Sequence, residues 1–214
     1  MTSAALRPLV AIVPVRALEG AKSRLGEVLD AEERRDLVIE LLERTIRAAL
    51  EASIVDRVIV VSEDPDALAI AARAGARTLR DDGGGLNGSL ALARAAARSD
   101  GAGSVLVLPG DLPSIAPGAI AAIASAAAQP PVVVLVTDRH HRGTNALLLS
   151  PPDVIPFAFG GDSRAAHAAL AAGAGATYVE LEGPLSLDLD TPDDLLLFDE
   201  LGWPADRIRS GHRG

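Results

Sequence analysis

The sequence contains no cysteine, so disulfide bonds, thiolate catalysis and cysteine-ligated zinc are all excluded. A chain without thiols is typical of a reducing compartment, and we expect the cytoplasm. No apolar run approaches the ~18 residues that a membrane-spanning helix needs. The apolar stretch from Leu9 to Val15 is short and lacks the basic region of a signal peptide, which favours a buried strand.

Aromatic residues and lysine are also scarce. Only five residues are aromatic (three Phe, one Trp and one Tyr), so the core must be built from closely packed Ala, Val, Leu and Ile. Lys22 is the only lysine among 20 basic residues, a bias that indicates a GC-rich genome and singles out Lys22 for a specific role. The net charge of −9 argues against a nucleic-acid or anionic-membrane partner, because such binding requires excess basic residues.

Apolar runs alternate with helical patterns along the chain, which predicts a doubly wound α/β fold. The expected strands are 9–15, 57–62, 76–79, 104–109, 132–137, 145–150 and a short strand around Tyr178. The expected helices are 30–50, 65–74, 89–98, 117–128, 162–172 and a last helix that is capped at Thr191. The segment 81–88 is rich in Asp and Gly and is expected to be a loop.

One connection departs from the parallel pattern. The polar segment 138–144 is short enough to join two antiparallel strands, so the sheet is expected to be mixed but mostly parallel. No repeat or linker divides the chain. We therefore expect a single three-layer αβα domain over residues 1–205, followed by a frayed tail over 206–214.

The loop after the first strand, residues 15–25, is unusually basic for an acidic protein. It carries Arg16, Lys22 and Arg24, and Gly20 allows a tight backbone path. Because open α/β sheets bind ligands at the carboxyl ends of their strands, these charges predict a pocket for several phosphates; a solvated basic loop is the alternative. The loop matches neither the Walker A pattern nor G-x-G-x-x-G, which argues against P-loop kinases and Rossmann dehydrogenases.

Carboxylates follow two later elements. Asp111 comes directly after an apolar strand, where a carboxylate can coordinate Mg²⁺. Asp188 and Asp190 lie at positions i and i+2, on one face of an extended segment. If the sheet brings them beside Asp111, the group would hold one or two divalent ions. The alternative is helix-start acidity, to which we assign Asp193 and Asp194.

Two further segments offer groups for an anionic acceptor. Gly143-Thr-Asn145 supplies a hydroxyl and backbone N–H groups, and Phe159-Gly-Gly-Asp-Ser163 leads into a helix N-terminus; each alone also fits an ordinary turn. His167 lies within a helix and is assigned to packing, and no Ser-His-Asp arrangement can be assembled. This absence fits nucleotidyl transfer, because an acceptor phosphate is already anionic and needs no general base.

Together these segments resemble the guanylyltransferases of coenzyme F420 biosynthesis over nearly the whole chain. The matching motifs are Val13-Pro-Val-Arg16, Ala21-Lys-Ser-Arg-Leu25, Glu32-Glu-Arg34, Pro109-Gly-Asp-Leu-Pro113, Gly143-Thr-Asn145, Phe159-Gly-Gly-Asp-Ser163 and Asp188-Leu-Asp-Thr-Pro192. The resemblance implies a nucleotide-diphospho-sugar transferase-like fold, shared with molybdenum-cofactor nucleotidyltransferases. It also implies transfer of GMP from GTP to phosphoenolpyruvate or 2-phospho-L-lactate with release of pyrophosphate. The arginine bias favours phosphoenolpyruvate.

The resemblance also implies roles for individual residues. The implied magnesium ligands are Asp111, Asp188 and Asp190. The implied catalytic residues, which hold the GTP phosphates, are Arg16, Lys22 and Arg24. The remaining implied nucleotide contacts are Ser62, Asp64, Asn87 and Asp111, and the implied acceptor contacts are Thr144, Gly160 and Ser163. Two departures stand out: Pro14-Val15 replaces the double glycine of the broader superfamily, and Arg164 could add a charge to the acceptor pocket.

Several alternatives stay open at this point. Another nucleotidyltransferase of the same fold would act on molybdopterin or a sugar phosphate, and a glycosyltransferase would share the metal carboxylates but bind a nucleotide sugar. From a different class, the chain could be a catalytically silent nucleotide-binding subunit. The acceptor is also open between phosphoenolpyruvate, 2-phospho-L-lactate and 3-phosphoglycerate, as are a homodimer and a contact with the next enzyme of the F420 pathway.

Overall fold

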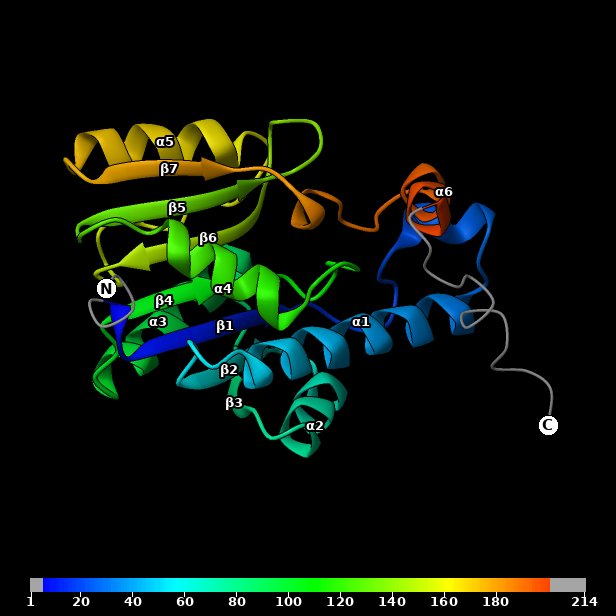
Figure 1. Ribbon diagram of the computed structural model, residues 1–214. Helices are drawn as coiled ribbons and strands as arrows, with labels where there is room; N and C mark the ends of the chain where they lie inside the picture. Colours follow the sequence, from blue (N-terminus) through cyan, green and yellow to red (C-terminus); the bar gives the residue numbers. More distant parts are fainter. Residues whose placement is uncertain (1–5, 201–214) are drawn as a thin grey trace.

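The computed structural model describes residues 6–200, and its centre is a seven-stranded sheet (Figure 1). The strands are β1 (Leu9–Val15), β2 (Arg57–Ser62), β3 (Arg77–Arg80), β4 (Ser104–Val107), β5 (Val132–Thr137), β6 (Thr144–Ser150) and β7 (Thr177–Leu181). Their order across the sheet is β3-β2-β1-β4-β6-β5-β7. Strand β6 runs antiparallel to both of its neighbours and every other pairing is parallel, so the predicted mixed sheet is confirmed.

Helices cover both faces of this sheet. They are α1 (Ala31–Glu51), α2 (Pro65–Arg73), α3 (Gly85–Ser99), α4 (Pro117–Ala126), α5 (Ser163–Gly173) and α6 (Pro192–Glu200), with the short 3-10 helices η2 (Ser23–Glu27) and η3 (Pro184–Ser186). Side chains alternate along each strand: Ala11 and Val13 pack with α1, α2 and α4, whereas Val10 and Ile12 pack with α3 and α5. The predicted three-layer αβα architecture is therefore confirmed.

A third apolar cluster lies beyond the edge of the sheet. It joins Leu25 of η2 and Leu37 of α1 to Leu189 and to Phe198 of α6. In Figure 1, α6 and the blue segment that follows β1 lie side by side near the first turns of α1, away from the strands. This cluster fixes the basic loop and the Asp188–Asp190 segment relative to each other.

The largest departure from the expected elements is the start of α3. The segment 81–88 was expected to be a loop, but α3 begins at Gly85, so its second half is helical. Asp81 accepts hydrogen bonds from the Ser89 hydroxyl and from Gly84 N, which tethers the first turn of the helix. Glycine lowers helix propensity by only about 1 kcal/mol, and such local contacts override it.

The remaining elements agree with the sequence to within a few residues. Strand β4 ends at Val107 rather than at 109, α4 ends at Ala126 rather than near 128, and the strand around Tyr178 is β7. Within residues 6–200, no helix is long and apolar enough to cross a membrane. The predicted domain boundary at 205 and the tail 206–214 lie outside the described residues.

Candidate active site

The candidate site lies at the edge where the parallel strands end. Strand β1 pairs with β2 and β4 in parallel, so the loops that follow these strands emerge side by side. Because β6 is antiparallel, its first residues, Thr144 and Asn145, reach the same edge. Leu189 N donates to the Asp111 carbonyl at 3.3 Å, which joins the segment before α6 to the loop after β4.

A cavity of about 630 Å³ opens between these loops. Arg16, Lys22, Asp111 and Asp190 are among its lining residues. Phe159, which precedes α5, lines it as well. The topology thus brings the basic loop and two of the candidate metal ligands to one cavity, as the strand-end argument predicts.

Asp111, Asp188 and Asp190 form one carboxylate cluster, with an oxygen of each within 4.8 Å of the others. Burial raises the pKa of Asp188, and the neighbouring charges of Asp111 and Asp190 raise it further. Asn145 Nδ2 donates to Asp188 Oδ1 at 3.3 Å and to the Leu185 carbonyl at 3.0 Å, which orients this carboxylate. Three close carboxylates are a donor set that suits a hard divalent cation.

Lys22, from the basic loop after β1, contacts two members of the same cluster. Its Nζ donates to Asp111 Oδ2 at 2.8 Å and to Asp190 Oδ1 at 2.6 Å, and its side chain is only 9% exposed. Burial alone would lower the pKa of Lys22, but attraction and hydrogen bonds from Asp111 and Asp190 outweigh it and raise the pKa. Lys22 is thus a fixed cation that faces the carboxylates.

The backbone of Lys22 is also unusual. Its φ is +54°, in the left-handed region that costs a non-glycine residue about 1–2 kcal/mol. This conformation occurs at the residue before η2, where the chain turns after Gly20, itself at φ +70°. The ion pairs of the Lys22 side chain offset that cost, and strained backbone of this kind is typical of functional sites.

The two predicted arginines of the basic loop differ in position. Both are exposed and neither forms an ion pair with another described residue. Arg16 lines the cavity, whereas Arg24 lies on η2 and is not part of its lining. The structure therefore brings Arg16 and Lys22 together and leaves Arg24 to the side.

Asp64 holds the basic loop through a hydrogen bond, and Ser62 in turn bonds to Asp64. Asp64 is the N-cap of α2, and its carboxylate also accepts from Leu18 N at 2.8 Å. Burial would raise the pKa of Asp64, but the backbone donors, led by Leu18, lower it. Ser62 Oγ accepts from Asp64 N at 3.0 Å. A direct nucleotide contact by these two residues stays a prediction.

Asn87 holds the segment before α5 rather than standing free. Its Nδ2 donates to the Phe159 carbonyl at 3.0 Å, and its Oδ1 accepts from Phe159 N at 2.9 Å. The amide thus binds both the N–H and the carbonyl of Phe159, a residue that lines the cavity. A contact between Asn87 and the nucleoside stays a prediction.

The predicted acceptor residues gather beside the cavity but do not line it. Thr144 and Ser163 are buried, at 8% and 3% exposure, while Gly160 is exposed with φ +155°. Their roles stay predictions. Arg164, a candidate for an extra charge in this pocket, instead pairs with Glu180 of β7 at 2.8 Å.

Comparison with known proteins gives the family. The family described as "Guanylyl transferase CofC like" matches residues 9–199, nearly all of the chain. The chain belongs to the CofC-like guanylyl transferase family. This agrees with the resemblance that the sequence motifs carry, and the family model spans every site residue discussed above.

Individual relatives agree with the family. The phosphoenolpyruvate guanylyltransferase of Rubrobacter xylanophilus is 44% identical over 193 residues, covering 90% of this chain and 94% of its own. The enzyme of the same name from Sphaerobacter thermophilus is 45% identical over 187 residues, covering 87% and 90%. A crystal structure from Desulfovibrio desulfuricans, provisionally assigned as a nucleotide-diphospho-sugar transferase, has a TM-score of 0.74 at 17% identity and covers 95% of this chain and 91% of its own. That likeness confirms the expected fold.

In this guanylyl transferase, Asp194 has a larger role than helix-start acidity. It lies in the first turn of α6 as expected, but its side chain is only 5% exposed. Its Oδ2 accepts from Asp190 N at 3.1 Å and from Thr191 N at 2.7 Å, and its Oδ1 pairs with Arg139 at 2.7 Å. Asp194 therefore holds the backbone of a candidate metal ligand. The T-x-x-D spacing indicates the cap, but no sequence signal reveals the partner from the β5–β6 loop.

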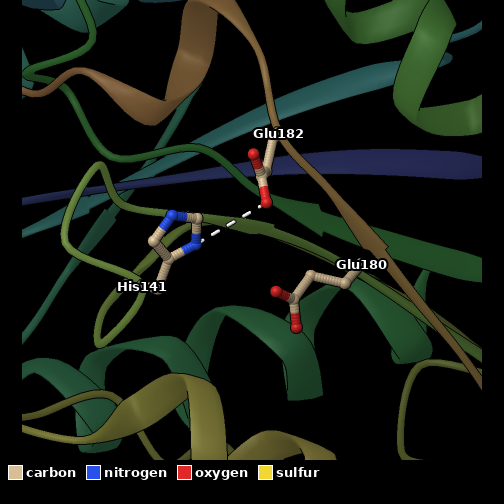
Figure 2. A group of neighbouring side chains, drawn as sticks. All are labelled: His141, Glu180 and Glu182. Carbon is tan, nitrogen blue, oxygen red and sulfur yellow. Dashed lines mark ion pairs between the residues drawn. The ribbon is translucent and has the colours of Figure 1, made fainter.

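A second group of possible metal ligands lies apart from the cavity. His141, Glu180 and Glu182 also bring ligand atoms within 4.8 Å of one another (Figure 2). Here the Glu180 carboxylate already pairs with Arg164 and accepts from the Tyr178 hydroxyl at 2.9 Å. Because an arginine balances its charge, this group is explained by ion pairing, and the aspartate cluster is the better metal-binding candidate.

Proposed function

We propose that this protein transfers GMP from GTP to phosphoenolpyruvate, with release of pyrophosphate, in coenzyme F420 biosynthesis. The observation that carries the proposal is the contact of Lys22 with Asp111 and Asp190 inside a cavity that Arg16 also lines. Family membership supports guanylyl transfer, and the relatives named phosphoenolpyruvate guanylyltransferase support the acceptor.

The reaction needs little covalent help from the protein. A phosphate oxygen of the acceptor forms a bond to the α-phosphorus of GTP, and the bond from that phosphorus to the α–β bridging oxygen breaks. The electron pair of the broken bond leaves with pyrophosphate. The attacking oxygen is anionic near neutral pH, so catalysis consists of positioning the reactants and balancing their charge.

The chain supplies that charge balance from two sides. Lys22 and Arg16 would hold the triphosphate from the basic loop, and Arg24 would assist from the adjoining η2. Mg²⁺ would be held by Asp111, Asp188 and Asp190. Their carboxylate oxygens lie close together, and a cation there would offset the unfavourable charge of Asp188, whose pKa is raised. Bound there, Mg²⁺ would neutralise phosphate charge and align the reacting oxygens.

The acceptor would lie against the start of α5. Thr144 and Ser163 offer hydroxyl donors, and the helix N-terminus that follows Gly160 favours an anion. Asn145 links this region to the metal ligands, because it follows Thr144 in β6 and bonds to Asp188. On the nucleoside side, Asp64 would hold the loop at Leu18 in place, and Ser62 would support Asp64.

The test is a product assay with the purified chain. GTP, CTP and ATP are each incubated with phosphoenolpyruvate, 2-phospho-L-lactate or 3-phosphoglycerate and a divalent metal, and pyrophosphate release is measured. Each reaction is also run with the next enzyme of the F420 pathway, because an unstable product can escape detection. We expect pyrophosphate only with GTP and, among the acceptors, mainly with phosphoenolpyruvate. Release with CTP and no release with GTP would contradict the proposal.

A further inference from the structure

His167 is a fully buried histidine at the centre of the acceptor region. It lies on α5 one turn after Ser163, so the two side chains share a face of the helix. Its ring contacts groups from two other segments, Thr144 of β6 and the stretch Ala158–Phe159 that leads to Gly160. One predicted acceptor residue, Thr144, thus bonds to this imidazole, and the other two are near it in sequence: Gly160 follows Phe159, and Ser163 lies one helical turn before His167.

The hydrogen bonds of this imidazole define its tautomer. Ala158 N lies 3.0 Å from Nε2, and because a backbone N–H can only donate, Nε2 must be the unprotonated acceptor. In the neutral ring the proton is then on Nδ1, which donates to Thr144 Oγ1 at 3.1 Å. Burial lowers the pKa of His167 to about 4, so the ring is neutral at physiological pH.

This donor restricts the direction of the Thr144 hydroxyl proton, which cannot point toward His167. With one lone pair of Oγ1 occupied by His167, the hydroxyl proton of Thr144 is left to donate to another group. An anionic acceptor is the partner that such a directed donor suits.

The same ring also fixes the segment that borders the cavity. Ala158 N is bound to Nε2, and the Phe159 ring packs edge-on against the imidazole at a centroid distance of 5.1 Å. Asn87 of α3 forms two hydrogen bonds with the Phe159 backbone. Residues 158–159, which lead to Gly160, are therefore held from both α3 and α5.

We propose that His167 is a positioning residue for the acceptor subsite, which directs the Thr144 hydroxyl toward the substrate and holds residues 158–159, which lead to Gly160, in the binding conformation. This inference rests on the proposed function, because it takes Thr144, Gly160 and Ser163 as the acceptor contacts. It gives the buried histidine a role in recognising the phosphorylated acid, beyond packing.

The kinetic test compares KM for the two substrates. We expect His167→Leu to raise KM for phosphoenolpyruvate by about tenfold or more while KM for GTP changes by less than about twofold. His167→Gln, which keeps a donor and an acceptor, should recover part of the loss. Thr144→Val should also raise KM for phosphoenolpyruvate, and the effects of the two substitutions should be less than additive in the double variant, because both remove the hydrogen bond between Thr144 and His167.

Leu170→Ala is the matched control, since Leu170 packs from the same helix without joining the network. It should lower stability and leave both KM values near those of the unsubstituted protein. The proposal would be overturned if His167→Leu raised KM equally for GTP and phosphoenolpyruvate, or if it changed neither KM.

A measurement on the unsubstituted protein keeps the inference testable if the variants do not fold. Nitrogen-15 NMR of the histidine side chains, with His167 assigned in the unsubstituted protein, should show this ring neutral with its proton on Nδ1. A proton on Nε2 would overturn the proposal. If the unsubstituted protein releases no pyrophosphate from GTP and phosphoenolpyruvate, the proposed function fails, whereas normal turnover with an unchanged KM in His167→Leu refutes only the role of His167.

Discussion

Lys22 Nζ lies 2.6 Å from Asp190 Oδ1, so the lone lysine of the chain contacts a carboxylate that we propose as a metal ligand. The same ammonium contacts Asp111 Oδ2 at 2.8 Å. A divalent cation on these carboxylates would therefore compete with Lys22 for the same oxygens. The competition leads to a prediction that separates metal binding from turnover.

Lys22→Met should tighten metal binding while it abolishes activity. Without the ammonium, three neighbouring carboxylates lose their balancing charge and attract a cation more strongly. We expect Mn²⁺ affinity, measured by electron paramagnetic resonance without nucleotide, to rise by about tenfold. Arg24→Met is the control, because it removes a charge from the same loop without a contact to the cluster. Equal effects of the two variants would refute a direct competition.

Asp188→Asn should stabilise the metal-free protein and inactivate it. Burial, Asp111 and Asp190 raise the pKa of Asp188, so its charged form lowers the stability of the folded protein. This loss of stability is present when the pH is above the pKa of Asp188 in the folded protein, and it is relieved as the pH falls through that pKa. Removing the charge should raise Tm at neutral pH by about 2–4 °C for each 1 kcal/mol of relief. A lower Tm for Asp188→Asn than for the unsubstituted protein in metal-free buffer would contradict the destabilising effect of the Asp188 charge.

Asp194→Ala should lower both stability and activity. The variant leaves the part-exposed Arg139 without its partner and releases the backbone of Asp190 and Thr191, and losing hydrogen bonds to a buried charged group costs about 1.5–3 kcal/mol. Urea unfolding and pyrophosphate release would measure the two effects. Asp193→Ala is the matched control, because Asp193 is exposed in the same helical turn. Similar losses of stability and activity in both variants would show that acidic charge at the helix start, rather than the contact with Arg139, is responsible.

His167 should make stability depend on pH. Its pKa is about 4 in the folded protein against 6.5 in the unfolded chain, so only the unfolded chain takes up this proton between those values. The stability that this group contributes is complete above pH 6.5 and falls by up to roughly 3 kcal/mol as pH drops to 4. The difference between the unfolding free energies of the unsubstituted protein and His167→Gln, measured across this range, should show that slope. A constant difference would contradict a buried neutral ring.

The sequence predicts the fold well because its signals are local. Apolar strands such as Leu9–Val15 and caps such as Asp30, which forms the expected capping box with Glu33, are each read from a few neighbouring residues. The start of α3 departs from the prediction because the glycine-rich composition of 81–88 indicates a loop, whereas the local contact between Asp81 and Ser89 holds the first turn of the helix. Strand order alone does not place Asp188 near Asp111, because β6 and β5 separate β4 from β7; the segment after β7 returns toward Asp111 through η3, which contacts β5 and β6.

The side-chain partners inside the site were harder to predict. The sequence indicates that Lys22 and the aspartates meet at one edge, but not that Asp194 is buried against Arg139, because that contact joins loops far apart in the chain. Likewise, His167 looks like an ordinary core residue until the positions of Ala158 and Thr144 are known. Contacts of this kind depend on tertiary geometry and leave no spacing pattern.

The most direct test of the central claim is mass spectrometry of the product formed from GTP and phosphoenolpyruvate by the purified chain with Mg²⁺, with Asp190→Asn as the inactive control. The account predicts a product in which GMP is joined to phosphoenolpyruvate through a diphosphate linkage, with one pyrophosphate released for each molecule. The yield with Asp190→Asn should be lower by a factor on the order of 10² or more. Absence of this product from the unsubstituted protein, with and without the next pathway enzyme, would contradict the account.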